Sequence, residues 1–240
     1  MQTSATTPPG TAADATGASS SRIPFFDALK AIASQLIVLH HLIAYGPMSE
    51  VARRHLPGLV DWLYYDARMS VQVFFVLGGY LAARALAPDL LPRIQSPAGA
   101  IWKRFGRLAL PCFAAVLISV ACAAVARMLI DDPSLPAPPT LTQLLAHALL
   151  LHDVLGYDAL SAGVWYVAID LQLFTLMAVL LWTARVVPGR LQPAAVLLMM
   201  TTAASVSLYL INRDTSWDIY APYFFGVYAL GAAAFWTTAP

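Results

Sequence analysis

The sequence predicts an all-α polytopic membrane protein, and three observations support this class. Apolar residues make up 59% of the 240 residues, whereas charged residues make up only 11%, against roughly a quarter in soluble domains. The mean hydropathy is +0.67. The apolar residues are grouped in blocks of about 20, the length that a helix needs to cross a bilayer. A soluble enzyme, a nucleic-acid-binding protein and a wholly disordered chain are therefore excluded, and a formal net charge of +1 gives no support for a polyanionic partner.

Two regions divide the chain. Residues 1–22 are rich in Ser, Thr, Ala, Gly and Pro, a composition that cannot bury a core, so we expect a disordered tail. The tail has neither the basic nor the apolar stretch of a signal peptide. Residues 23–240 make up the second region, a transmembrane domain.

Six apolar blocks in this domain are long enough to span a bilayer. They cover about residues 26–46, 69–88, 106–130, 161–184, 192–212 and 217–236. Residues 141–153 are apolar but short, which predicts one re-entrant or surface-lying helix. Residues 48–66 mix Arg and acidic side chains with Leu and Trp, and we interpret them as an interfacial segment.

The distribution of basic residues predicts the orientation of the domain, because Lys and Arg are enriched in cytoplasmic loops. The connections after the second and fourth spans carry six of them: Arg93, Lys103, Arg104, Arg107, Arg185 and Arg190. The loops on the other side carry several acidic residues, although Arg53, Arg54 and Arg68 also lie there. The pattern places the N-terminus in the cytoplasm.

Ionisable residues inside a span cost about 2.5–3.5 kcal/mol each on insertion scales, so they usually serve a function. The first span holds four of them: Asp27, Lys30, His40 and His41. In a helix, Lys30 and His41 differ by about 20° in azimuth and by about 16 Å along the axis. Asp27, Ser34 and Tyr45 fall on the same face, whereas His40 points about 80° away. This polar stripe predicts a functional cavity; an ion pair at the membrane edge and an interfacial histidine are the alternatives.

Two further clusters of charge stand out. Asp170 lies within the fourth span, where a buried carboxylate needs a partner, and His41 or Lys30 would serve. A purely structural ion pair is the alternative. At the predicted start of the third span, Arg104 and Arg107 share a helical face and could bind a phosphate in fork geometry. Basic residues at a cytoplasmic span end are also common without any such role.

Four segments of the chain resemble, in the right order, motifs of one protein family. The string DALKAIASQLIVLHH contains Asp27, Lys30 and His41, and it is followed by FFVLGGYL at 74–81, KRFGRLALP at 103–111 and WYVAIDLQLF at 165–174. Together they resemble the bacterial integral-membrane acyltransferase-3 family, whose members O-acylate surface polysaccharides and other small acceptors. In that family's pattern, Lys30 replaces an Arg, Gly78 replaces a Ser, and Asp170 replaces a Glu. Family members have about ten spans, so we expect the domain to be incomplete at its C-terminus.

The resemblance implies a membrane-bound enzyme that moves an acyl group, expected to be acetyl, from acyl-coenzyme A to a hydroxyl of a carbohydrate or other small acceptor. His41 would be the catalytic base, and Asp170 or Asp27 would fix its tautomer. Lys30, Arg104 and Arg107 would bind the phosphates of the acyl donor. Direct transfer and an acyl-histidine intermediate both remain open.

The same resemblance predicts no tightly bound cofactor and no metal, with acyl-coenzyme A as a co-substrate. The protein is expected to lie in the lipid bilayer of the cytoplasmic (inner) membrane. No nucleic-acid partner is expected. Two other functions fit the intramembrane charges. A proton-coupled transporter needs Asp, Lys and His within the membrane as well, and a catalytically inactive membrane scaffold would retain them without turnover.

Overall fold

The computed structural model describes residues 23–46, 48–131 and 135–238 of the chain, so the predicted tail at 1–22 lies outside the described residues. Within those ranges the regular structure is entirely helical. The α-helices are α1 (Pro24–Tyr45), α2 (Ser49–His55), α3 (Pro57–Tyr65), α4 (Val71–Leu86), α5 (Pro97–Leu129), α6 (Leu141–Ala148), α7 (Val164–Ala184), α8 (Gln192–Tyr209) and α9 (Ala221–Thr238). Four short 3₁₀ turns connect them: η1 (Ala67–Ser70), η2 (Gly189–Leu191), η3 (Ile211–Arg213) and η4 (Thr215–Trp217).

By length and composition, five helical stretches of the described chain can cross a membrane, and they correspond to the first five predicted spans. They are Pro24–Tyr45, Pro57–Leu86, Pro97–Leu129, Val164–Ala184 and Gly189–Arg213. The all-α polytopic class is therefore confirmed. The second stretch is longer than predicted, because α3 continues through η1 into α4. Asp61 interrupts the apolar run within α3, and Asp66 lies at the turn between α3 and η1.

The sixth predicted span, at 217–236, forms helix α9 but is not one of these five. Pro222, Tyr223 and Tyr228 make it less apolar than the others. Half of its residues are buried, including Tyr228, which is fully enclosed. The structure therefore supports five of the six expected spans, and the sixth predicted span forms a helix that packs among its neighbours.

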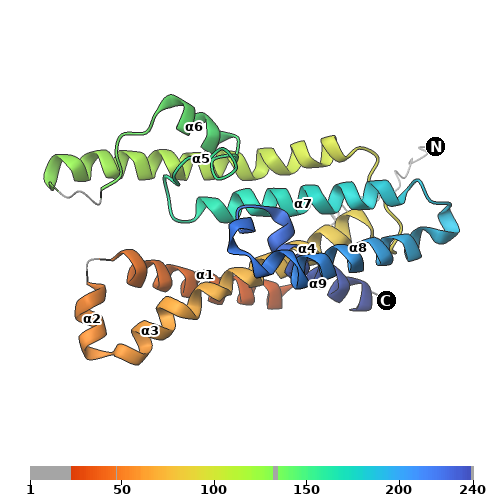
Figure 1. Cartoon of the computed structure of the whole chain (residues 1–240), viewed down its shortest axis with the longest axis horizontal. Coiled ribbons are helices and arrows are strands. Elements are labelled where there is room, and N and C mark those ends of the chain that lie inside the picture. Colours follow the sequence, from red (N-terminus) through yellow and green to blue (C-terminus); the bar gives the residue numbers. More distant parts are fainter. Residues whose placement is uncertain (1–22, 47, 132–134, 239–240) are drawn as a thin grey trace, which may run out of the picture.

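The long helices form an elongated bundle with two distinct ends (Figure 1). At one end α1 finishes, α4, α7 and α9 begin, and α6 lies alongside; we call this the α6 end. The start of α1 packs on α4, because the rings of Phe26 and Tyr80 meet edge to face with centroids 4.8 Å apart. Its other half packs on α3, where His40 Nδ1 lies 3.1 Å from the carbonyl oxygen of Leu63. Helix α1 therefore runs antiparallel to α3 and α4.

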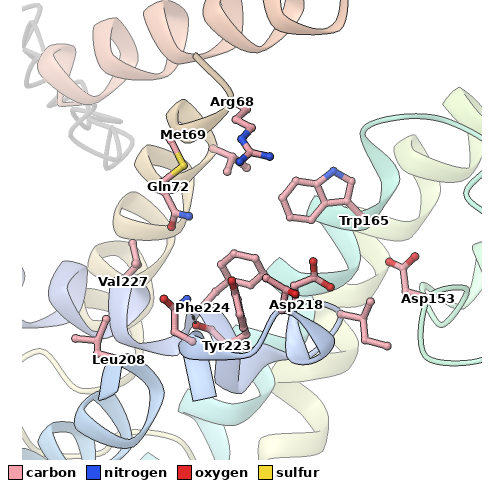
Figure 2. A pocket seen from close by; sticks show the side chains of 14 residues that line it. Arg68, Met69, Gln72, Asp153, Trp165, Leu208, Asp218, Tyr223, Phe224 and Val227 are labelled. Carbon is pink, nitrogen blue, oxygen red and sulfur yellow. Dashed lines mark hydrogen bonds between the residues drawn. The ribbon is translucent and has the colours of Figure 1, made fainter. Parts of the chain in front are cut away.

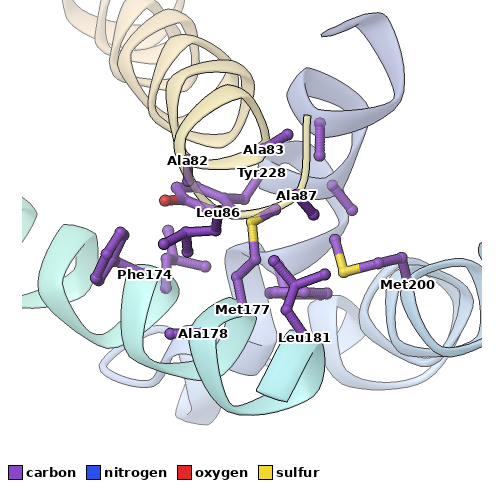
Figure 3. Close-up of a cluster of buried hydrophobic side chains, with 14 of the residues drawn as sticks. Ala82, Ala83, Leu86, Ala87, Phe174, Met177, Ala178, Leu181, Met200 and Tyr228 are labelled. Carbon is purple, nitrogen blue, oxygen red and sulfur yellow. The ribbon is translucent and has the colours of Figure 1, made fainter. Parts of the chain in front are cut away.

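The largest core cluster fills the space between α4, α7, α8 and α9 (Figure 3). Small side chains on α4 and α7, such as Ala83 and Ala178, allow close approach, while Met177, Leu181 and Met200 fill the remaining volume. At the far end the indole Nε1 of Trp236 donates to the carbonyl of Ala87 at 2.8 Å. This core holds α7 in position, and it thereby positions the side chains of α7 that face the interior of the bundle.

Helices α4 and α9 are in backbone contact through glycines. A Cβ atom on Gly231 would overlap the carbonyl group of Val76, and one on Gly79 would overlap the carbonyl group of Tyr228. Small residues are what allow helix backbones to approach closely in membranes. The position of α9 in the bundle therefore depends on the absence of these two side chains.

We expect Gly231→Ala to lower the stability of the bundle by about 1–3 kcal/mol, because the added methyl meets backbone that cannot rotate away. Thermal unfolding in detergent measures the effect. Gly106→Ala is the matched control, since a Cβ at Gly106 on α5 meets nothing within 4 Å. Alanine in that helix should be neutral or stabilising. Equal unfolding temperatures for Gly231→Ala and the wild type would contradict the close packing.

Candidate active site

A buried ion pair joins α5 to α7 inside the bundle. Arg104 Nη2 donates to Asp170 Oδ1 at 2.8 Å and to Oδ2 at 2.7 Å, and its Nε donates to Oδ2 at 3.2 Å. The Asp170 side chain is 6% exposed and that of Arg104 is 24% exposed. The guanidinium also lies over the ring of Phe174, one helical turn further along α7, at 4.6 Å from its centroid. Both charges are thus neutralised within the protein.

Helices α4 and α9 close around this pair. A Cβ atom on Gly78 would lie 3.0 Å from Cε2 of Tyr228 and 3.3 Å from Oδ1 of Asp170, so all three residues meet at one point. Each lies six or seven residues into its helix, about 10 Å from the α6 end of the bundle. The Tyr228 hydroxyl is buried without a hydrogen-bond partner among the described residues. The glycine at position 78, where the family pattern has Ser, leaves room for the tyrosine ring.

The partner of Asp170 differs from the one that the sequence suggested. We expected His41 or Lys30, but the carboxylate binds Arg104, and within the described residues no hydrogen bond or ion pair links it to α1. The physical reason is that α1 packs along α3, η1 and α4 rather than on α7. Sequence spacing within one helix cannot reveal which neighbour that helix will face.

The two arginines of the third span are also separated. Arg104 points into the bundle, whereas Arg107 is exposed on its surface. Helix α5 begins at Pro97, earlier than the predicted start near 106, and Ser96 caps it by accepting a bond from the backbone N–H of Gly99 at 3.4 Å. Arg104 is therefore two turns inside the helix rather than at its mouth. Arg104 is engaged by Asp170 whereas Arg107 is not, and the joint contact of the two arginines with the phosphates of an acyl donor remains a prediction.

The polar stripe of α1 is present, but its members have different environments. Lys30 and Ser34 are half-buried, and the Ser34 hydroxyl donates to the Lys30 carbonyl at 2.7 Å. Asp27 and Tyr45 are exposed. Within the described chain, Asp27 forms no ion pair with Lys30. The stripe therefore faces the bundle mainly through Lys30, Ser34 and His41.

The two adjacent histidines have different contacts. His40 is tied to the backbone of α3 through the carbonyl of Leu63. The Nδ1 atom of His41 is buried and has no hydrogen-bond partner among the described residues, and the His41 ring stacks on Tyr45 with centroids 5.8 Å apart. His41 is four residues from the last residue of α1, so it lies at the α6 end. Of these two histidines, His41 is the one with a buried ring nitrogen that no described residue engages.

An open pocket of about 700 Å³ lies at the same end, where η1, α4, α7 and α9 begin (Figure 2). Its lining includes Arg68, Gln72, Asp153, Trp165 and Asp218. The sequence analysis selected none of these for a site, because they come from four separate segments without a shared motif. The one available signal was Arg68, which runs against the charge distribution of the surrounding loops.

Two buried histidines support the loop that carries Asp153. The rings of His147 and His152 stack with centroids 4.2 Å apart, and both are about fully buried. His147 Nδ1 lies 2.8 Å from the carbonyl oxygen of Gln143, and His147 Nε2 accepts from the backbone N–H of Leu160 at 3.1 Å. His152 Nε2 lies 3.3 Å from Oδ2 of Asp153. This arrangement suits uncharged imidazoles.

Burial lowers the pKa of His152 below its ordinary value of 6.5, although the neighbouring carboxylate of Asp153 opposes the shift. The unfolded chain therefore takes up this proton first, and the stability that His152 contributes is complete above about pH 6.5 and lost as the pH falls through its folded pKa. We expect the unfolding temperature to drop less on acidification in His152→Phe, which keeps the stacking without the titration. Identical pH profiles from about pH 7.5 to about pH 5 would contradict this.

These features define a polytopic helical membrane protein with a largely buried charge pair, an unpartnered histidine and an open pocket of mixed polar and apolar lining. A family model described as an acyltransferase domain matches residues 23–236, nearly all of the described chain. The chain belongs to the acyltransferase-3 family. Comparison with curated proteins and with solved structures gave no match.

Proposed function

We propose that this membrane acyltransferase transfers an acyl group, acetyl in the simplest case, from acyl-coenzyme A to a hydroxyl of a carbohydrate or other small acceptor. The observation that carries the proposal is the family match across residues 23–236, which includes all four motif segments. The available nitrogen of His41 supplies the base that such a reaction needs.

In the proposed reaction His41 accepts the proton of the acceptor hydroxyl as its oxygen attacks the thioester carbonyl. The carbon–oxygen bond forms, the carbon–sulfur bond breaks, and the imidazolium returns the proton to the departing thiolate. A positioned base of this kind contributes about 10²–10⁴-fold to the rate. Asp27 is exposed and Asp170 is held by Arg104, so neither bonds to His41 in this arrangement; orientation of the ring by either residue would require a rearrangement on substrate binding.

Lys30 and Arg107 are the better candidates for the phosphates of the donor. Lys30 lies about 16 Å from His41 along α1, which suits a donor whose charged end remains away from the reacting thioester. Arg107 is exposed, and it forms no ion pair within the described chain. Arg104 would contribute indirectly, by holding Asp170 and α7 in place.

We also propose that the protein resides in the cytoplasmic membrane with its N-terminus in the cytoplasm. The distribution of charge supports this orientation, because Arg93, Arg185 and Arg190 lie in connections at the end opposite α6. Acidic residues such as Asp153 and Asp218 lie at the α6 end. The donor would then enter from the cytoplasm, and the α6 end would face outward.

Binding of acetyl-coenzyme A to the detergent-purified protein tests the donor assignment. We expect Lys30→Ala and Arg107→Ala each to weaken binding several-fold, because each removes one charge contact to a phosphate. Arg213→Ala is a matched control, since it removes an exposed Arg from the α6 end. Binding that is equally weakened by all three substitutions would reject the assignment, and absence of binding to the wild type would favour the transporter or inactive-scaffold alternatives.

A further inference from the structure

The pocket at the α6 end is lined by hydrogen-bonding and aromatic groups from separate elements. Arg68 and Gln72 project from η1 and α4, whereas Trp165 and Asp218 project from α7 and the segment before α9 (Figure 2). Asp153, Asn212, Thr215 and Tyr223 add further polar and aromatic groups, and the rest of the lining is apolar: Met69, Val71, Leu208, Ile219, Phe224 and Val227. The volume of about 700 Å³ is typical of sites for small molecules.

Most of the polar groups in this pocket are not engaged by one another. Arg68 donates through Nε to the carbonyl of Tyr65 at 3.2 Å, and within the described chain it forms no ion pair. Asp218 likewise forms no ion pair there. The Oε1 atom of Gln72 is buried and has no hydrogen-bond partner among the described residues. A buried acceptor without a partner is costly, so a ligand that donates to it would be stabilised.

The chemistry of the lining selects a class of ligand. Carboxylate and amide oxygens accept hydrogen bonds, which suits a molecule with several hydroxyl groups. The faces of Trp165 and Tyr223 offer apolar surface for the C–H face of a ring. Two carboxylates against one guanidinium leave the lining with one net negative charge, which repels an anion and attracts a cation.

We propose that this pocket is the acceptor site, and that it takes a neutral or cationic polyhydroxylated molecule, such as a hexose or an amino sugar, rather than an acidic sugar. The assignment rests on the proposed acyltransferase function. Its location agrees with that function, because His41 and the pocket lie at the same end of the bundle, and η1, which lines the pocket, packs against α1.

Direct binding of three probes to the purified chain tests the proposal without any acyl donor. The probes are methyl glucoside, glucosamine and glucuronate. Saturation-transfer NMR or calorimetry measures the binding of each probe. We expect the affinity for glucuronate to be at least about fivefold lower than the affinity for the other two probes. The reason is repulsion between the carboxylate of glucuronate and the net negative charge of the lining. Asp218→Asn should reduce this difference, and Trp165→Leu should weaken all three probes.

Asp214→Asn is the matched control. It removes the same charge from the same segment, and asparagine can keep the cap that Asp214 provides to the backbone N–H of Ser216. No binding of any probe, equal affinity for glucuronate, or the same effect from Asp214→Asn and Asp218→Asn would overturn the pocket assignment. If the thioester is still turned over but no probe binds, the pocket assignment fails and the proposed function stands. If the sugars bind but no thioester is turned over, the proposed function fails.

Discussion

His41→Ala should reduce acyl transfer by about 10²–10⁴-fold while leaving membrane insertion and folding intact. The imidazole Nδ1 is buried without a partner, so its removal costs no hydrogen bond within the described residues. The expected loss is therefore confined to the chemical step. Rates of transfer from acetyl-coenzyme A by matched amounts of folded protein measure it.

His40→Ala is the control at the adjacent position. Its loss breaks the contact with the carbonyl of Leu63 and should lower stability by about 0.5–1.5 kcal/mol, with transfer reduced less than tenfold. His41→Ala should therefore lower mainly the activity, whereas His40→Ala should lower mainly the stability. Equal loss of activity from both would contradict the assignment of His41 as the base.

Asp170→Ala should destabilise the bundle by about 3–5 kcal/mol, because it leaves the guanidinium of Arg104 buried without its counter-charge. Thermal or denaturant unfolding in detergent measures this loss. It is the largest stability effect that we expect from a single polar side chain in the described structure. A change below about 0.5 kcal/mol would show that the pair is not formed in the membrane protein.

The double variant Arg104→Met/Asp170→Leu separates structure from function. Replacement of a buried ion pair by apolar residues is often neutral or stabilising, so we expect most of the stability to return. If the ion pair serves only to hold α5 and α7 together, the activity of the double variant should return as well. Restored stability with activity still lost would assign the charges a direct part in the reaction.

The helical class and the first five spans could be predicted from the sequence, because blocks of apolar residues report directly on the surrounding solvent. The start of α5 at Pro97 was missed, since Lys103 and Arg104 interrupted the apolar run, although Ser96 and Pro97 form a recognisable helix start. Helix α9 was predicted as a span, but its proline and tyrosines make it less apolar than the five candidate spans, and Tyr228 is enclosed by other helices.

The candidate site was predictable only where its residues share one helix. The face of α1 that carries Lys30 and His41 follows from helical periodicity, and the described structure keeps both half-buried. The pairing of Asp170 with Arg104 depends on which helices become neighbours, and no spacing within α5 or α7 encodes that. The pocket was not predictable for the same reason, because Gln72, Trp165 and Asp218 converge only once α4, α7 and the start of α9 have packed.

Transfer of a labelled acetyl group from acetyl-coenzyme A to methyl glucoside, by purified protein in liposomes, tests the central claim most directly. The wild type should transfer label to the glycoside, and His41→Ala should do so at least about 100-fold more slowly. The central claim would be contradicted if the folded wild-type protein neither transferred label nor hydrolysed the thioester above the rate of the His41→Ala protein.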